Sequence, residues 1–375
     1  MSKKSSDALT PVSQATRGTR RRRLALVVIP ITLLVAGAAA FLATGGYTQW
    51  QDQRSLDNAC RGLLPQSALK TLMGTDRLHE ANDKSVKSRT SIGWLDSCSI
   101  EARSGGSTDF SIAWGENAGL ALSILNRHDS GPDPGIAVPI GHGWSGTMKW
   151  DRESAESSVI LACPTTGKSL LVSVNSLKTH GAFDTPTRFG ALAQVAIETA
   201  TAAANKLRCS AQLGSPVRAI DLPLEVRRHP IPLSQAQGSC RMLRSLEPAL
   251  MDQGVRGVVE TPINNSLVED CSLTNTEGEP LYHLTAYYGP YARDVPNTRA
   301  WAETEPAGIN EKAGIAWATA ECARFFGPAR FTSGILYRST GERSAPANPE
   351  LQRQLVRAFS GDAVERHGCS ETSQP

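Results

Sequence analysis

The chain has no cysteine before residue 60, no charged residue from Leu24 to Gln51 and no closely spaced cysteine pair. The smallest gap between cysteines is 31 residues, from Cys209 to Cys240 and again from Cys240 to Cys271. Structural zinc sites draw on close pairs such as C-x-x-C, so this spacing argues against a zinc site. Neither a metal nor another cofactor is predicted.

Complete catalytic motifs are also missing. Neither G-x-S-x-G nor K-T-G occurs, and the seven histidines form no H-x-H or H-x-x-x-H pair. Ser67 and Lys70 match S-x-x-K, in which the serine is a nucleophile and the lysine its base. With 36 serines and 10 lysines in 375 residues, about one such match arises by chance. Lys70 is therefore interpreted as part of a solvated helix face, and no catalytic residue is predicted.

Charge is distributed unevenly along the chain, although the net charge is only +3. Residues 1–23 contain seven Lys and Arg against one Asp, a net charge of +6, so the remaining residues sum to 3 − 6 = −3. A mildly acidic body gives no support to nucleic-acid binding.

An uncharged apolar run, LALVVIPITLLVAGAAAFLATGG, covers residues 24–46. Its 23 residues exceed both the ~20 that span a bilayer and the ~7–15 of a cleavable signal peptide. The arginines directly before it predict a cytoplasmic N-terminus by the positive-inside rule; they are Arg20, Arg21, Arg22 and Arg23. We expect a cytoplasmic basic tail (1–23), a transmembrane signal anchor (24–46) and extracellular C-terminal domains on a single-pass protein of the cell membrane. A signal peptide cleaved near AGAAA is the alternative.

All cysteines follow the apolar run. There are eight of them: Cys60, Cys98, Cys163, Cys209, Cys240, Cys271, Cys322 and Cys369. An even number of cysteines in an exported chain indicates disulfides, because the compartment outside the membrane is oxidising.

Two heptapeptides resemble each other, WLDSCSI at 94–100 and LVEDCSL at 267–273. The segments before them align without gaps, CRGLLPQSALKTLMG at 60–74 with CRMLRSLEPALMDQG at 240–254. Leu and Ala recur there at helical spacing, and the closing glycine is typical of a helix C-cap. This match indicates an internal duplication.

The same order of elements continues in both copies. Residues 98–115 and 271–289 alternate in polarity on either side of a glycine-containing turn, which predicts hairpins. A second hairpin is expected around the third cysteine of each copy, and amphipathic helices are expected at 190–209 and 348–369. The predicted fold is therefore α+β, each copy consisting of a helix, antiparallel hairpins and a C-terminal helix.

Duplication restricts the disulfide pairing. Eight cysteines allow 105 pairings, pairing within copies leaves nine, and an identical pattern in both copies leaves three. We choose first with second and third with fourth, which gives Cys60–Cys98, Cys163–Cys209, Cys240–Cys271 and Cys322–Cys369.

The domain boundaries follow from the repeat. Repeat 1 is expected at 47–209 and repeat 2 at 240–369, followed by a disordered tail at 370–375. Residues 210–239 contain four prolines and no long periodic pattern, which predicts an extended linker, with AIDLPLEV as an edge strand.

One short stretch is a candidate binding loop. His142 and Trp144 lie in GHGW at 141–144, between glycines. A glycine turn before a strand is the other interpretation of this stretch.

The opening DNACRGLLPQSALKTLMG, followed by DSCSI, is similar to actinobacterial secreted and lipoprotein domains of unknown function. The two-disulfide α+β layout also resembles extracellular sensor domains of mycobacterial receptor kinases. This chain departs from them by having two copies, no lipid-modified cysteine and no kinase domain. The resemblance implies an envelope protein and brings no catalytic residues to this chain.

These features predict a non-enzymatic single-pass membrane protein whose extracytoplasmic domain binds a ligand or partner in the cell envelope. Its expected partners are the membrane and an envelope protein or small molecule. Two alternatives stay open: a Ser/Lys hydrolase of cell-wall peptides that uses Ser67 and Lys70, and a structural envelope scaffold.

Overall fold

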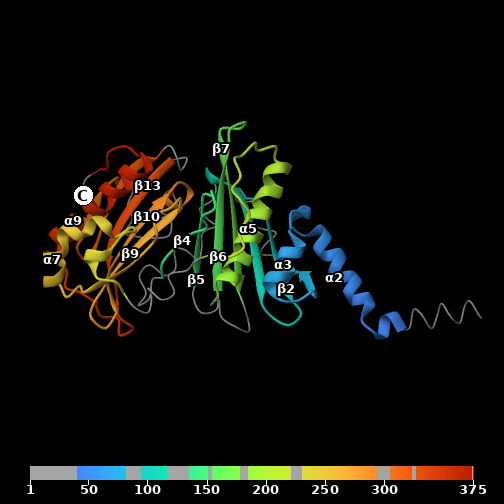
Figure 1. The fold of residues 1–375 in the computed structure, drawn as a ribbon. Coiled ribbons are helices and arrows are strands. Elements are labelled where there is room, and N and C mark those ends of the chain that lie inside the picture. Colours follow the sequence, from blue (N-terminus) through green and yellow to red (C-terminus); the bar gives the residue numbers. More distant parts are fainter. Residues whose placement is uncertain are drawn as a thin grey trace, which may run out of the picture. The chain divides into compact units, whose positions relative to one another are not determined.

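Two antiparallel sheets and their covering helices form an α+β fold in the computed structural model (Figure 1). The structure describes residues 40–81, 94–116, 135–150, 154–177, 185–220, 230–293, 305–322, 327–373 and 375. It divides into two compact units, residues 1–54 and residues 55–375. Both sheets lie in the larger unit, where we call residues 55–220 the first half and residues 230–375 the second half.

The first half contains a seven-stranded sheet. In spatial order its strands are β1 (Leu78–Glu80), β2 (Trp94–Ala102), β3 (Ser107–Trp114), β7 (Lys168–Leu177), β6 (Ser154–Cys163), β5 (Gly146–Trp150) and β4 (Val138–Pro139). Every pairing is antiparallel. The expected hairpin at 98–115 corresponds to β2 and β3, and the hairpin around Cys163 to β6 and β7.

The second half contains a six-stranded sheet. Its strands, in spatial order, are β8 (Gly257–Glu260), β9 (Val268–Thr274), β10 (Pro280–Tyr288), β13 (Gly327–Ile335), β12 (Ile315–Cys322) and β11 (Gly308–Asn310). Read across each sheet from β1 and from β8, the orders β1-β2-β3-β7-β6-β5 and β8-β9-β10-β13-β12-β11 have the same arrangement, and β4 is an additional strand at the far edge of the first sheet.

One face of each sheet is covered by the helix that precedes its last cysteine. These helices are α5 (Pro186–Lys206), which packs on β6 and β7, and α9 (Pro349–His367), which packs on β12 and β13. Each begins with a side-chain cap, because Thr185 accepts from the Arg188 N–H and Asn348 accepts from the Leu351 N–H. Each then has a proline in its first turn, where the missing N–H costs nothing.

Shorter helical segments include α2 (Gly46–Asn58), η1 (Ala59–Gly62), α3 (Gln66–Met73), η4 (Leu233–Gln235), η5 (Arg241–Leu246) and α7 (Glu247–Asp252). Helix α3 begins directly after Pro65 and ends at Gly74, whose φ of 68° is left-handed, as the glycine C-cap predicts.

Four disulfides close the two halves. They are Cys60–Cys98, Cys163–Cys209, Cys240–Cys271 and Cys322–Cys369, which are the pairs expected from the repeat. In each half one bridge joins the segment before the short helix to the second strand of the sheet. The other joins the hairpin to the end of the long helix.

The expected membrane anchor at 24–46 lies mainly outside the described residues, as do Arg20 to Arg23. Of this segment the structure describes residues 40–46, which form one helical turn, a break at Thr44 and Gly45, and the start of α2. Within the described ranges, no helix is both long and apolar enough to cross a membrane.

The expected linker at 210–239 has little regular structure where it is described. Ile231 forms an isolated bridge with Val258, and η4 is a single 3-10 turn. The edge strand expected at AIDLPLEV falls almost entirely on residues 221–229, outside the described ranges.

Candidate functional site

The two acids of LVEDCSL lie on opposite faces of β9. Neighbouring side chains of a strand alternate, so Glu269 points to the face of the sheet that carries Cys271 and helix α9, and Asp270 points away from it. Both carboxylates are buried, with side-chain exposures of 1% and 0%. The motif therefore places a negative charge inside the protein on each side of the second sheet.

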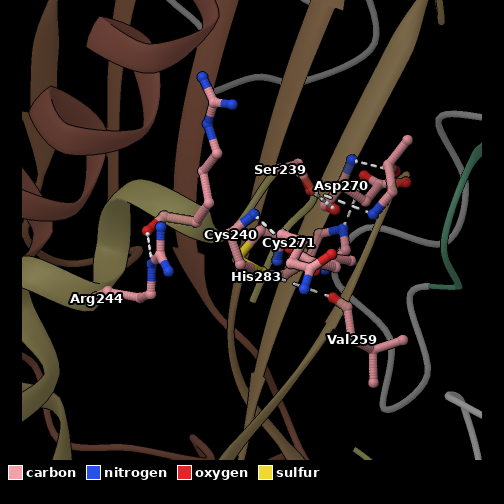
Figure 2. Close-up of a disulfide and its surroundings, with 11 residues drawn as sticks. Ser239, Cys240, Arg244, Val259, Asp270, Cys271 and His283 are labelled. Atoms are coloured by element: carbon pink, nitrogen blue, oxygen red, sulfur yellow. Dashed lines mark hydrogen bonds and ion pairs between the residues drawn. A yellow bond between two sulfur atoms is a disulfide. The ribbon is translucent and has the colours of Figure 1, made fainter. Parts of the chain in front are cut away.

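Asp270 is held by groups of the second half (Figure 2). Its Oδ1 accepts a hydrogen bond from the Thr285 hydroxyl at 2.9 Å and lies 3.1 Å from Nε2 of His283. Its backbone N–H donates to the Thr261 hydroxyl at 2.8 Å. A buried carboxylate is tolerated only when its oxygens are paired, and these contacts satisfy Oδ1.

The other oxygen of Asp270 is held by the first half. The Ala137 N–H donates to Oδ2 at 2.7 Å, and Nζ of Lys149 lies 3.8 Å from the same oxygen. The Thr261 hydroxyl in turn donates to the Ala137 carbonyl at 2.7 Å. Lys149 is as buried as its partner, at 3% side-chain exposure. Asp270 thus joins residues that are 133 positions apart in the chain, and we call this set the Asp270 clasp.

Apolar and polar contacts surround the clasp. Ala137, Ile160 and Leu171 of the first half belong to the same hydrophobic cluster as the core of the second half. On the same face of the first sheet, Glu156 accepts hydrogen bonds from the hydroxyls of Ser158 and Ser173 at 3.1 and 2.7 Å. The sheet face opposite α5 is therefore polar but buried.

Asp270 and His283 have the geometry of an acid that orients an imidazole, as in triad hydrolases. Their side chains are only 0% and 2% exposed, however, so a substrate has no path to the imidazole. Nδ1 of His283 has no hydrogen-bond partner among the described residues. The contacts of this pair are those of a structural junction.

Glu269 is the centre of a second buried network. Its Oε1 lies 2.9 Å from Nε2 of His367 and 3.0 Å from Nη1 of Arg366, and its Oε2 accepts from Arg366 at 2.7 Å and from the Tyr288 hydroxyl at 3.2 Å. Arg366 also donates to Asp362 at 2.8 Å, and Arg241 donates to the same carboxylate at 2.7 Å. This network ties α9 to the strand beside the Cys240–Cys271 bridge.

The network shifts the pKa values of its members in opposite directions. Burial raises the pKa of Glu269, but the hydrogen bonds from Arg366 and His367 outweigh burial and leave the pKa below its ordinary value. Burial, followed by the charge of Glu269, raises the pKa of Tyr288 well above its ordinary value. The network therefore stabilises Glu269 in its charged form, which is typical of a carboxylate with a structural role.

The first half has a weaker counterpart at Asp96, the acid of WLDSCSI. Nε of Arg61 lies 3.5 Å from its Oδ2, and the Arg61 side chain is 64% exposed. Burial raises the pKa of Asp96, and the charges of Arg61 and Lys206 offset this only in part. The pKa of Asp96 is thus raised, whereas the pKa of the equivalent acid Glu269 is lowered.

The clasp has no counterpart acid in the first half. Ser97 stands where Asp270 stands in the second, because the heptapeptides align at Cys98 and Cys271. This extra acid in the second heptapeptide is the one sequence signal that could have indicated Asp270. Lys149 and His283 carried no such signal.

The candidate loop at 141–144 is a left-handed turn with separated side chains. Gly141, His142 and Gly143 have φ values of 75°, 55° and 83°, and His142 is exposed. Trp144 is only 4% exposed, and its indole N–H donates to the Ser215 carbonyl at 2.7 Å. The two side chains therefore do not share a binding surface, and Trp144 belongs to the first-half core.

The S-x-x-K pair lies on α3. Ser67 is exposed and Lys70 partly exposed, and neither side chain hydrogen-bonds the other. The Ser67 carbonyl accepts from the Thr71 hydroxyl at 3.0 Å, an ordinary contact within a helix.

Within the described ranges, no group of three or more His, Cys, Asp or Glu side chains is arranged to hold a metal ion. The chain matches no protein-family model, no curated protein and no solved structure.

Proposed function

We propose that the chain is a single-pass membrane protein whose extracytoplasmic domain binds a ligand or partner in the cell envelope without catalysing a reaction. Residues 1–23 are its cytoplasmic tail, and residues 24–46 are its signal anchor. The uncharged run and the four preceding arginines support this orientation.

The cysteines carry the proposal. All eight lie after the apolar run, all eight are paired and no cysteine is free. Disulfides persist outside the membrane and are rare in the cytosol, where thiols are kept reduced. A chain with this arrangement is therefore suited to an oxidising compartment.

We also infer that the extracytoplasmic domain arose by duplication, with repeat 1 at 47–209 and repeat 2 at 240–369. The shared strand order and the equivalent bridges of the two halves support this inference. The clasp between the halves supports a single binding body instead of two independent modules. Its residues come from both halves, and it exists only when they pack together.

Binding is favoured over catalysis by the state of the ionisable groups. Asp270 and Glu269 are fully engaged in internal contacts, and the Asp270–His283 pair is closed to substrate. Ser67 and Lys70 do not contact each other through a hydrogen bond. A general base takes its proton through a hydrogen bond to the nucleophile, and no such bond joins these two side chains in the structure.

The orientation is tested with C-terminal fusions of the full chain to alkaline phosphatase, which is active only outside the membrane, and to a fluorescent protein that matures in the cytoplasm. We expect phosphatase activity and no fluorescence. A control fusion that lacks residues 1–46 is expected to lose the phosphatase activity. Fluorescence of the full-chain fusion would contradict the proposed topology.

The hydrolase alternative is tested by labelling the purified full chain with a fluorescent β-lactam. We expect no labelling. Labelling that disappears in Ser67→Ala and remains in Ser104→Ala, a variant at another exposed serine, would replace the binding proposal with a Ser/Lys hydrolase. Native mass spectrometry of the same sample then separates a small-molecule ligand, seen as a defined extra mass, from a protein partner.

A further inference from the structure

Exposed large apolar side chains are concentrated at the start of the described chain. Among the described residues nine such side chains are exposed, and four of them lie within residues 41–50. These are Phe41, Leu42, Tyr47 and Trp50, with exposures of 49%, 61%, 48% and 50%. A group of exposed apolar residues this dense in sequence marks a contact surface.

Helix α2 presents three of its side chains on one face. Tyr47, Trp50 and Arg54 follow an i, i+3, i+7 spacing, so they project from the same side of the helix (α2 in Figure 1). The Tyr47 and Trp50 ring centroids are 6.0 Å apart, and Cζ of Arg54 lies 5.3 Å from the Trp50 ring centroid. Leu56, on the opposite side of the helix, is buried.

The composition of this face fits the membrane–water boundary. Tyrosine and tryptophan have an apolar ring and a polar group, and both are enriched where hydrocarbon meets headgroups. Arginine places its charge toward phosphate while its stem covers apolar surface. The face follows directly on the uncharged run that ends at Gly46.

Helix geometry places these side chains at the depth of the headgroups. At a rise of about 1.5 Å per residue, Tyr47, Trp50 and Arg54 lie at most about 2, 6 and 12 Å beyond Gly46 along α2. One headgroup layer is about 5–8 Å thick, from the difference between the whole bilayer and its hydrocarbon core. Both rings therefore fall within the layer. The Arg54 backbone lies beyond it, but the guanidinium carbon is 5.3 Å from the Trp50 ring centroid, so the charge reaches back toward the headgroups.

We propose that Tyr47, Trp50 and Arg54 form an interfacial collar that contacts phospholipid headgroups of the outer leaflet and fixes the depth and orientation of the extracytoplasmic domain. This inference rests on the proposed membrane anchor. Phospholipid is the occupant because the face adjoins the apolar run and combines aromatic rings with a cation at headgroup depth.

The test uses the full chain reconstituted in phosphatidylcholine–phosphatidylglycerol vesicles, with bromine on the acyl chains as a contact quencher of tryptophan. With seven tryptophans in the chain, Trp50 is expected to contribute about one seventh of the emission, and this share is quenched in the wild type. Trp50→Phe removes the quenched share. The matched control is Trp114→Phe, since Trp114 also carries a cation over its ring, with Nζ of Lys168 at 5.9 Å.

Bromine near the headgroup end of the acyl chain is expected to quench Trp50 more than bromine near the chain end. One result would overturn the collar alone: the protein resists carbonate extraction from membranes, but bromine quenches the tryptophan emission of wild type and Trp50→Phe equally. The anchor would then hold the protein in the membrane without contact between Trp50 and lipid. A contact between Trp50 and a second copy of the chain instead of lipid would give that result. Release of the protein by carbonate overturns the anchor and the collar together.

Discussion

Replacing Glu269 with glutamine removes the negative charge from a carboxylate that four hydrogen bonds hold. Two come from Arg366, one from His367 and one from Tyr288. The amide of glutamine has one oxygen, so its NH₂ group would face donors that now meet Oε1 or Oε2. Arg366 keeps its contact with Asp362, which limits the loss.

The expected cost is large because the group is buried. Removing one partner of a buried ion pair costs about 3–5 kcal/mol, and the surviving Asp362 contact favours the lower end, about 3 kcal/mol. For the unit of residues 55–375, whose unfolding entropy is about 0.7 kcal/mol/K, that corresponds to a fall in Tm of roughly 4–5 °C.

Asp96→Asn is the matched control, because Asp96 is the equivalent acid of the first half. Its pKa is raised by burial, so its charge is disfavoured in the folded protein, and its exposed partner Arg61 compensates only weakly. Exposed pairs contribute about 0–1 kcal/mol. At pH 7 this variant is expected to change stability by at most about 1 kcal/mol, in either direction.

The pH dependence distinguishes the two acids. Folding lowers the pKa of Glu269 below its ordinary value of 4.5. The Glu269 carboxylate therefore stabilises the folded protein fully above pH 4.5, and this stabilisation is lost as the pH falls through the pKa that Glu269 has in the folded protein. The gap between wild type and Glu269→Gln should therefore narrow as pH falls from 5. Asp96, with a raised pKa, favours folding as pH falls toward its ordinary value of 3.8.

The assay is denaturant unfolding of the full chain in mild detergent, followed by far-UV circular dichroism at pH 7 and at pH 4. Equal destabilisation by Glu269→Gln and Asp96→Asn at pH 7 would show that the buried network does not make the Glu269 charge more stabilising than the Asp96 charge. So would a Glu269→Gln effect that is the same at both pH values, because the charge would then not be the cause.

Three further predictions follow from single contacts. Lys149→Met leaves the buried Asp270 without its cation and should lower the free energy of unfolding by about 3 kcal/mol. Chemical unfolding measures this change, and an effect below experimental error would show that Lys149 and Asp270 do not form a charge pair. Arg208 has a left-handed φ of 56° at the position where the second half has Gly368, with a φ of 62°. Arg208→Gly should therefore stabilise the protein by about 1 kcal/mol, and Gly368→Ala should destabilise it by about the same amount. Thermal melts in which both substitutions shift Tm in the same direction would contradict this. Removing the Cys322–Cys369 bridge, whose cysteines are 47 residues apart, should cost about 4 kcal/mol by loop entropy; unchanged unfolding would show that the closed loop adds no stability.

Local patterns were enough to predict the long helices. The disulfides needed the repeat, which left three pairing patterns, and the chosen one is present. The helix expected at 348–369 is α9, Pro349–His367. The helix expected at 190–209 is α5, which begins four residues earlier because Thr185 caps it and Pro186 opens it. It ends earlier too, since Arg208 adopts a left-handed conformation that no local pattern indicated.

The clasp could not be predicted because its chemistry depends on packing between distant segments. Lys149 lies in GTMKW, a stretch with no motif, and no feature of it indicates a partner 121 residues later at Asp270. Trp144 shows the same limit, because glycine neighbours suggested an exposed loop while the tertiary fold buried the indole. Periodicity reports which face of an element is apolar, but not which distant polar group will meet it.

The most direct test of an exported, fully oxidised protein is the intact mass of the full chain after it is alkylated in whole cells under denaturing, non-reducing conditions. With four disulfides, we expect a mass eight hydrogens below that of the reduced chain, with no alkyl group added. Alkylation of any of the eight cysteines in a large share of the protein would contradict an extracytoplasmic location for this domain.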